Sequence, residues 1–282
     1  MKPIIVVAID FSDGSLNALH FAIQTANCVD ANIMLVWVEK KQNNMSIYAN
    51  ASDPRLEVKK RFEEIIETHT PELKNGKFMF KMRNGKIYRE IVNQAKYHDA
   101  IMIVAGTHGA SGFEEFWIGS NAYKIVTYSE CPVVTIRNEY SCKKTIKKIV
   151  FPIDSTQDTR QKLPFCARLA KYYNAEILLV SLYSSEHETI KEIVDGYTDQ
   201  VRKYLSEREI KNETFSLQAD NLTNSTINFA LEHDADLIAI MTEQESATSN
   251  LLLGNYAQQM VNHSPIPVLS IRSKSIYDYQ TK

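Results

Sequence analysis

Four of the chain's nine glycines lie close together, in a run that begins at Gly106 and ends at Gly119-Ser120. The run follows the apolar segment 100–105 and precedes a segment of helical character at 121–126. Glycine permits positive φ and lets a ligand come close to the backbone, and the N–H groups of a helix's first turn attract anions. A strand, a glycine-bearing loop and a helix start therefore predict a binding site for a phosphorylated ligand.

The elements around this run belong to an internal repeat. Residues 4–10 match residues 148–154 at an offset of 144, and later matches have an offset of 135. The later pairs are His98-Asp99-Ala100 with His233-Asp234-Ala235, Gly119 with Gly254, Pro132-Val133-Val134 with Pro267-Val268-Leu269, and Arg137 with Arg272. We place the surplus of the first half in the polar stretch 42–53 and divide the chain into two domains, residues 1–140 and 141–282.

Each half alternates short β-branched runs with longer segments of helical period, which is typical of βαβ units and a parallel sheet. Strands are expected at 4–9, 32–38, 77–82, 100–105 and 132–136, and at 148–153, 175–181, 213–218, 236–241 and 267–271. The fold class is therefore α/β, with two tandem open doubly wound parallel sheets of five strands each. Asp13 is the expected N-cap of the first helix.

In doubly wound sheets, ligands bind beyond the carboxyl ends of the strands, where the strand order reverses. Asp10, the residues after Val36 and the glycine run all follow such strand ends. They can therefore converge on one crevice.

The composition narrows the classes of partner. Apolar residues make up 44% of the 282 residues and charged residues 23%, and the net charge is -2. This charge gives no field that would attract nucleic acid or an acidic membrane, and no stretch reaches the roughly 18 apolar residues of a membrane span. The four cysteines show no Cys-x-x-Cys spacing, so reduced thiols are expected. We expect a cytoplasmic protein that has neither nucleic acid nor a membrane as partner.

The motif resembles that of the universal stress protein family, in a tandem arrangement. Two residues separate Gly106 from Gly109 and nine separate Gly109 from Gly119-Ser120, while Asp10 ends the first strand and Cys131-Pro132-Val133-Val134 opens the fifth. The resemblance covers both halves. Other nucleotide signatures fit poorly, because the run lacks the Gly-Lys-Ser or Gly-Lys-Thr of a P-loop and the first strand is not followed by Rossmann glycine spacing.

The resemblance implies that the first half binds ATP, and it leaves open whether Mg²⁺ accompanies the nucleotide. The implied contacts are Ala8, Ile9 and Asp10 at the ribose and adenine, Val38 at the adenine edge, Ala105, Gly106 and Gly109 along the ribose and phosphates, and Gly119, Ser120 and Asn121 at the phosphates. Asn121 departs from the small aliphatic residue common in the family, although its amide can donate to phosphate.

Simpler roles stay open for several of these residues. Asp10 could only cap a turn, and Gly119-Ser120 could only be a helix start with a serine N-cap. Trp37 and Trp117 are more typical of packing than of ligand contact, and His108 could simply be solvated.

The second half departs from the motif. Met241 and Gln244 stand where the first half has Gly106 and Gly109, and acidic residues lie beside them at 243 and 245. We therefore expect no ATP in the second half, hence one nucleotide per chain, and we attribute the retained Gly254 to packing. Divalent metal binding by Glu243, Glu245 and Asp154 is an alternative, but solvated loop acids are the favoured interpretation.

The family resemblance also implies how the halves associate. Fifth strands pair across dimers in that family, so residues 133–136 and 268–271 could pair within one chain. The fold would then be an intrachain pseudo-dimer, and further pairing of chains into a homodimer is left open.

These observations favour an ATP-binding regulatory protein of the stress response, with an unknown protein partner. The alternative is a dimeric interaction scaffold that works without nucleotide. An adenylate-forming transferase is disfavoured, because residues 10–15 contain one glycine and two acids in place of a pyrophosphate loop. No general base, metal-binding aspartate pair or phosphate-directed lysine is evident, so no catalytic residue is assigned, although slow ATP hydrolysis or self-phosphorylation stays open.

Overall fold

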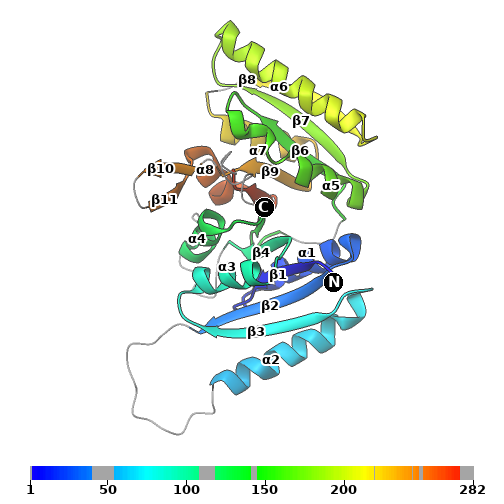
Figure 1. The fold of residues 1–282 in the computed structure, drawn as a ribbon, viewed down its shortest axis with the longest axis vertical. Helices are drawn as coiled ribbons and strands as arrows, with labels where there is room; N and C mark the ends of the chain where they lie inside the picture. Colours follow the sequence, from blue (N-terminus) through cyan, green and yellow to red (C-terminus); the bar gives the residue numbers. More distant parts are fainter. Residues whose placement is uncertain are drawn as a thin grey trace.

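The computed structural model describes residues 2–39, 54–107, 118–140, 145–218, 220–242, 244–247 and 250–273. Two α/β halves share one ten-stranded sheet, with the first half below and the second above in Figure 1. The strand order is β3-β2-β1-β4-β5-β12-β9-β6-β7-β8. Every neighbouring pair is parallel except β5 and β12, which are antiparallel.

The strands of the large sheet are those that the sequence predicts. In the first half they are β1 (Ile4–Ala8), β2 (Asn32–Glu39), β3 (Phe78–Asn84), β4 (Met102–Gly106) and β5 (Val133–Ile136). In the second half they are β6 (Lys148–Ile153), β7 (Glu176–Tyr183), β8 (Asn212–Gln218), β9 (Leu237–Met241) and β12 (Val268–Ile271). The doubly wound α/β class and the two tandem halves of five parallel strands each are confirmed, and β5 and β12 join the two sets of strands into one sheet.

Helices cover both faces of the sheet, which is why its strands are apolar on both sides. The helices of the first half are α1 (Asp13–Val29), α2 (Pro54–His69), the 3₁₀ turn η1 (Thr70–Glu72), α3 (Ile87–Tyr97) and α4 (Ser120–Tyr128). Those of the second half are the 3₁₀ turn η2 (Gln157–Arg160), α5 (Leu163–Tyr173), α6 (Glu188–Ser206), α7 (Leu222–Glu232) and α8 (Asn255–His263).

Strand alternation divides the core between the two faces. In β1, the side chains of Ile5 and Val7 join the core under α1 and α2, whereas those of Ile4 and Val6 join the core under α3 and α4. The first of these cores continues under α5 and α6 of the second half, and a separate core lies under α7 and α8.

The first helix starts one residue earlier than predicted. Ser12 is the N-cap of α1, since its hydroxyl accepts a hydrogen bond from Ser15 N at 3.3 Å, and Asp13 is the first helical residue. The prediction of Asp13 as N-cap is therefore wrong by one position. The carboxylate of Asp13 still lies in the first turn, where the helix dipole favours negative charge.

The two halves associate through their fifth strands, as an intrachain pseudo-dimer. β5 pairs with β12 in the register Val134 to Leu269, and both residues are fully buried. Beside this seam, the Tyr173 hydroxyl on α5 donates to Thr25 Oγ1 on α1 at 2.7 Å. The predicted pairing of the fifth strands within the chain is confirmed.

A second, small sheet was not predicted. β10 (Gln244–Ala247) and β11 (Asn250–Leu253) form an antiparallel hairpin that lies beside α8 and α4 in Figure 1. By the repeat offset of 135 it is the counterpart of part of the glycine run, so the interpretation of this segment as a loop is wrong, whereas the solvation of its acidic side chains stays a prediction.

Two further observations bear on the sequence predictions. In the part of the chain that the structure describes, no helix is long and apolar enough to cross a membrane. The thiols of Cys28, Cys131 and Cys166 are free, and burial raises the pKa of Cys166 to about 12. Cys142 lies outside the described residues, and the reduced state of the cysteines stays a prediction.

Candidate functional site

A cavity opens at the carboxyl ends of β1, β2 and β4, where the strand order of the first half reverses. It contains about 590 Å³ of atom-free space, part of it open to solvent. The lining residues are Ala8, Ile9, Asp10, Ser15, Val36, Trp37, Val38, Ile87, Ile91, Ala105, Gly106, Thr107, Gly119, Asn121, Ala122 and Ile125.

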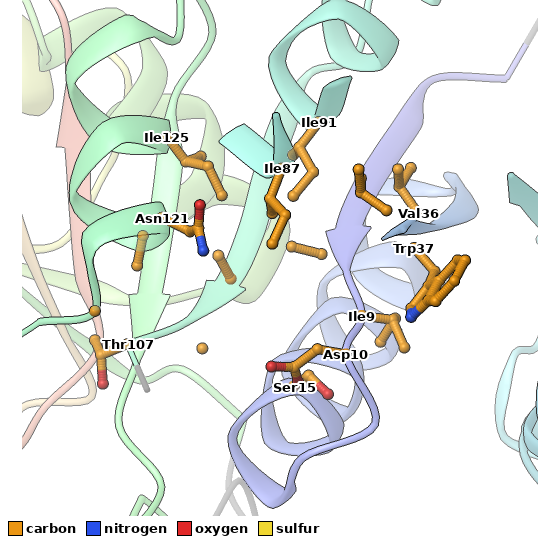
Figure 2. Close-up of a pocket in the computed structure, with 16 residues that line it drawn as sticks. Ile9, Asp10, Ser15, Val36, Trp37, Ile87, Ile91, Thr107, Asn121 and Ile125 are labelled. Atoms are coloured by element: carbon orange, nitrogen blue, oxygen red, sulfur yellow. The ribbon is translucent and has the colours of Figure 1, made fainter. Parts of the chain in front are cut away.

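The walls of this cavity are mostly apolar. Figure 2 shows Ile87 and Ile91 of α3 facing Val36 of β2 across the space, with Ile125 of α4 behind Asn121. Trp37 borders the cavity too, but its indole packs against the core on the other face of the sheet. The packing role for Trp37 therefore agrees with the structure, whereas Trp117 lies outside the described residues.

The backbone of β2 borders the cavity where β1 has ended. The pairing of β1 with β2 stops at Ala8 opposite Val36, and Ile9 N donates to Val36 O at 2.9 Å. Alternation along a strand points the N–H and C=O of Val38 to the same side as those of Val36. They are thus directed toward the cavity rather than toward β3.

Asp10 at the end of β1 takes part in a tight turn. Its Oδ1 accepts hydrogen bonds from Ser12 N at 3.1 Å and Ser12 Oγ at 2.5 Å. The second half contains the same turn, since Asp154 Oδ1 accepts from Thr156 N at 2.8 Å and Thr156 Oγ1 at 2.5 Å. The turn role of this aspartate is therefore a feature of the fold, and Asp10 also lines the cavity.

Gly106 at the end of β4 is required by packing. A Cβ at this position would lie 2.8 Å from Gly14 C and 2.9 Å from Gly14 O, at the start of α1. The positive φ expected of the glycine run is not found at Gly106 or Gly119, since Gly85 is the one glycine with positive φ in the described part of the chain. Close approach of the first turn of α1 to β4 explains Gly106 instead.

Gly119 begins the helix that points its N-terminus at the cavity. It is the N-cap of α4, its N donates to Thr107 O at 2.7 Å, and glycine has no side chain with which to cap the first turn. The first turn contains no acidic residue, so the N–H groups and the helix dipole leave this end of the cavity favourable to an anion.

The structure gathers eight of the ten predicted contacts around one cavity. These are Ala8, Ile9, Asp10, Val38, Ala105, Gly106, Gly119 and Asn121. Ser120 is the exposed first residue of α4 and is not in the lining, while Gly109 and His108 lie outside the described residues. For all of the predicted contacts, the role in ligand binding stays a prediction.

Sequence reasoning missed the apolar side chains on the helices. Ile87 and Ile91 on α3 and Ile125 on α4 lie one helical turn or more from any motif residue. Their spacing of four on α3 could have suggested a common face, but it does not distinguish a cavity wall from ordinary core.

The same location in the second half is built differently. Met241 replaces Gly106, is 5% exposed and packs in the core under α5 and α6. Between β6 and α5 the chain forms η2, so α5 begins later after its strand than α1 does in the first half. Glu243 and the side chain of Glu245 lie outside the described residues, so the metal alternative stays a prediction.

The second half also supports the cavity of the first. Asn262 on α8 is 3% exposed, and its Oδ1 accepts a hydrogen bond from Ile118 N at 3.0 Å, next to Gly119. Arg137 Nη1 donates to the backbone oxygen of the same asparagine at 2.7 Å. Leu253 and Val261 of the second half complete the core behind α4. No motif indicates Asn262, because its contact is visible only across the two halves.

Fold and site together define a doubly wound α/β protein with a ligand cleft at the reversal of strand order. The family model described as the universal stress protein family matches residues 1–137 and again residues 145–272. The chain belongs to the universal stress protein family, with two copies of its domain in tandem.

Individual relatives agree with this assignment. "Universal stress protein YxiE" of Bacillus subtilis is 32% identical over 143 residues, which cover 47% of this chain and 97% of that protein. "Universal stress protein MJ0531" of Methanocaldococcus jannaschii is 29% identical over 147 residues, which cover 47% of this chain and 81% of that protein. In fold, a universal stress protein from Archaeoglobus fulgidus is similar over 95% of this chain and 98% of its own, with a TM-score of 0.77 and 14% identity.

Proposed function

We propose that the first half binds one adenine nucleotide, ATP, and that the protein acts as a nucleotide-dependent regulator of the stress response. One observation carries this proposal: an apolar slot at the strand-order reversal leads to the N-terminus of α4, where the N-cap is a glycine and the first turn has no acidic residue. The slot between Val36 and the isoleucines of α3 suits a planar base, and the helix start suits phosphates.

The backbone supports the adenine position. The N–H and C=O of Val38 point toward the cavity beyond the end of β1, and such a donor and acceptor pair matches the edge of an adenine ring. Asp10 and the backbone of Ala105 and Gly106 would then border the ribose, and Gly119, Ser120 and Asn121 the phosphates.

The lining indicates binding rather than rapid catalysis. Among the described lining residues, Asp10 is the one charged side chain. Phosphoryl transfer depends on cationic groups and metal ligands around the transferred phosphate. We therefore expect any hydrolysis to stay well below the roughly 1 s⁻¹ of slow kinases. Mg²⁺ would reach the site mainly as the ATP complex, held by the phosphates.

Equilibrium dialysis of the untagged full chain against labelled ATP tests the proposal. We expect saturable binding of one nucleotide per chain. Absence of saturable binding at millimolar ATP would refute it and would favour a nucleotide-independent scaffold. Mass spectrometry of gently purified protein would identify which adenine nucleotide co-purifies.

The scaffold alternative has a structural constraint. β5 lies between β4 and β12, and β12 lies between β5 and β9, so both fifth strands have neighbours on each side. Chains cannot pair through these strands without breaking the intrachain seam. A homodimer of chains, a protein partner and the cytoplasmic location stay predictions.

A further inference from the structure

Two histidines and a glutamate gather on the outer side of the first half, apart from the nucleotide cavity. His20 lies in the middle of α1, His69 is the last residue of α2, and Glu72 is the last residue of η1. One donor atom of each lies within 4.8 Å of the others. Three separate elements thus bring together two imidazoles and a carboxylate, and neither the family motif nor the proposed function uses them.

The contacts within this cluster are close. The rings of His20 and His69 pack edge to face, with centroids 5.0 Å apart and an interplanar angle of 84°. His69 Nδ1 lies 2.9 Å from Glu72 Oε1. Both histidines are partly buried and Glu72 is exposed, so the cluster is held by packing on one side and open to water on the other.

The backbone beneath Glu72 is anchored to the helix that carries His20. Asn27 of α1 donates from Nδ2 to Glu72 O at 2.8 Å, and its Oδ1 accepts from Lys74 N at 2.8 Å. The side chain of one residue on α1 therefore fixes the chain on both sides of Leu73. This anchor sets the distance between Glu72 and His20 before any ligand arrives, which lowers the ordering cost of binding.

The donor set has a definite chemical preference. Imidazole nitrogens with one carboxylate oxygen bind Zn²⁺ and neighbouring first-row metals, and an open position is then filled by water. Bonds of about 2.0–2.2 Å place ligand atoms of a tetrahedral site roughly 3.3–3.5 Å apart. His69 and Glu72 are already near that separation, and His20 and the exposed Glu72 side chain can close the remaining gap by rotation.

We propose that His20, His69 and Glu72 form a site for a divalent transition metal, with Zn²⁺ as the best match. The ion would join the middle of α1 to the end of α2 and to η1. Burial, and next the neighbouring His69, lower the pKa of His20, which keeps a neutral imidazole lone pair available at neutral pH. At the position of His20 the second half has Pro164, so this site belongs to the first half alone.

Titration of the untagged full chain with Co²⁺ and Zn²⁺ tests the site. We expect one equivalent of Co²⁺ to give visible absorption bands typical of nitrogen and oxygen ligands, and Zn²⁺ to displace it. His69→Gln and His20→Gln should each weaken Zn²⁺ affinity by at least about tenfold, and Glu72→Gln by a smaller factor. His187→Gln, at the start of α6, is the matched control and should bind as the wild type does.

The outcomes separate the site from other causes. Circular dichroism without metal shows whether each variant is folded, and Glu72→Gln, at an exposed residue, provides a test if a histidine variant fails to fold. Wild-type affinity in folded His20→Gln, His69→Gln and Glu72→Gln would overturn the proposal. So would a thiolate charge-transfer band in the Co²⁺ spectrum, since that band reports cysteine ligation, or a lack of binding at about 0.1 mM Zn²⁺.

Discussion

The two halves of the chain share a fold but differ at one place, and the shared features show which parts of the motif are structural. Both halves end the first strand in an aspartate that accepts from the residue two positions on, Ser12 in one and Thr156 in the other. The second half thus keeps this aspartate turn, although we expect no nucleotide there. Asp10 alone therefore cannot mark a nucleotide site.

The helix start at the end of the glycine run is shared as well. Gly119 N donates to Thr107 O at 2.7 Å, and Gly254 N donates to Thr242 O at 3.2 Å. Each glycine is the N-cap of the following helix with nearly the same φ and ψ. The two glycines thus occupy the same capping position, while the packing role predicted for Gly254 stays a prediction.

What differs is the space in front of that helix start. In the first half, α1 begins three residues after Asp10 and approaches Gly106 closely enough to exclude a Cβ. In the second half, η2 intervenes and α5 begins nine residues after Asp154, while Met241 fills the position of Gly106. The start of the first helix and the residue at the position of Gly106, rather than the aspartate turn or the glycine N-cap, distinguish the halves and are the features to test.

The largest expected effect comes from blocking the helix start in the first half only. Gly119→Val with Ser120→Ala should lower ATP affinity by more than about a hundredfold, because branched carbons would occupy the space in front of the N–H groups at the start of α4. Gly119 has an ordinary φ of -58°, but a Cβ there would lie 3.1 Å from Thr107 O, so circular dichroism must show that the variant is folded. Isothermal titration calorimetry measures the effect.

Gly254→Val is the matched control, since its backbone has a φ of -57° and the same helix-capping position. It should leave ATP affinity unchanged. Equal loss of binding in both folded variants would contradict a single nucleotide site in the first half.

A second test compares two glycines that differ in their surroundings. Gly106→Ala should lower the free energy of unfolding by about 2–3 kcal/mol, because its Cβ would meet the backbone of Gly14 at 2.8 Å. Gly196→Ala, in α6 of the second half, meets nothing within 4 Å and should stabilise the protein by about 0.4–1 kcal/mol. Urea denaturation followed by circular dichroism measures both. A Gly106→Ala variant as stable as the wild type would show that close packing does not require this glycine.

The sequence was sufficient to predict the large sheet because its information is local and repeated. Apolar runs at β1 and β6 end in the same Ile-Asp pair, and independent matches at β5 and β12 fix the second offset. The seam between β5 and β12 followed from the family resemblance. The hairpin of β10 and β11 was missed because each strand has only four residues, and the sequence between them has no Asn-Gly or Asp-Gly pair, the usual signal of a hairpin.

The sequence predicted the parts of the candidate site that are formed by glycines of the motif. It did not predict the parts that are formed by side chains from distant segments. Gly106 and Gly119 were found by their spacing, but the reason expected for them, positive φ, was wrong. Close approach to Gly14 depends on where α1 begins, which the sequence pattern does not give to within one residue. Ile87 and Asn262 were missed because their contacts join segments that are distant in the chain.

A third, smaller effect tests the support that the second half gives to the first. Asn262→Leu keeps the volume but leaves the buried Ile118 N–H without its acceptor, which should cost about 1–2 kcal/mol of stability. ATP affinity should fall about three- to tenfold, because Ile118 precedes the N-cap of α4. Thr127→Val, at the equivalent position of the repeat, loses a bond to Tyr123 O within α4 and is the control. Equal ATP affinity in the two variants would show that this contact from the second half does not support nucleotide binding by the first.

For the last variant we expect no change in ATP binding. It tests whether glycines alone are sufficient to make a nucleotide site. Met241→Gly with Gln244→Gly restores the residue types of the first half at the start of the altered segment. We nevertheless expect dialysis to show one ATP per chain, because η2 still precedes α5 and the buried Lys162 ammonium still donates to Thr159 O at 2.5 Å beneath that helix start. Such a cavity needs a helix that starts directly after the first strand, and two side-chain deletions do not shift a helix start. Binding of a second equivalent would show that Met241 and Gln244 alone close the second half, and that the displaced helix is a consequence of the lost glycines rather than an independent obstacle.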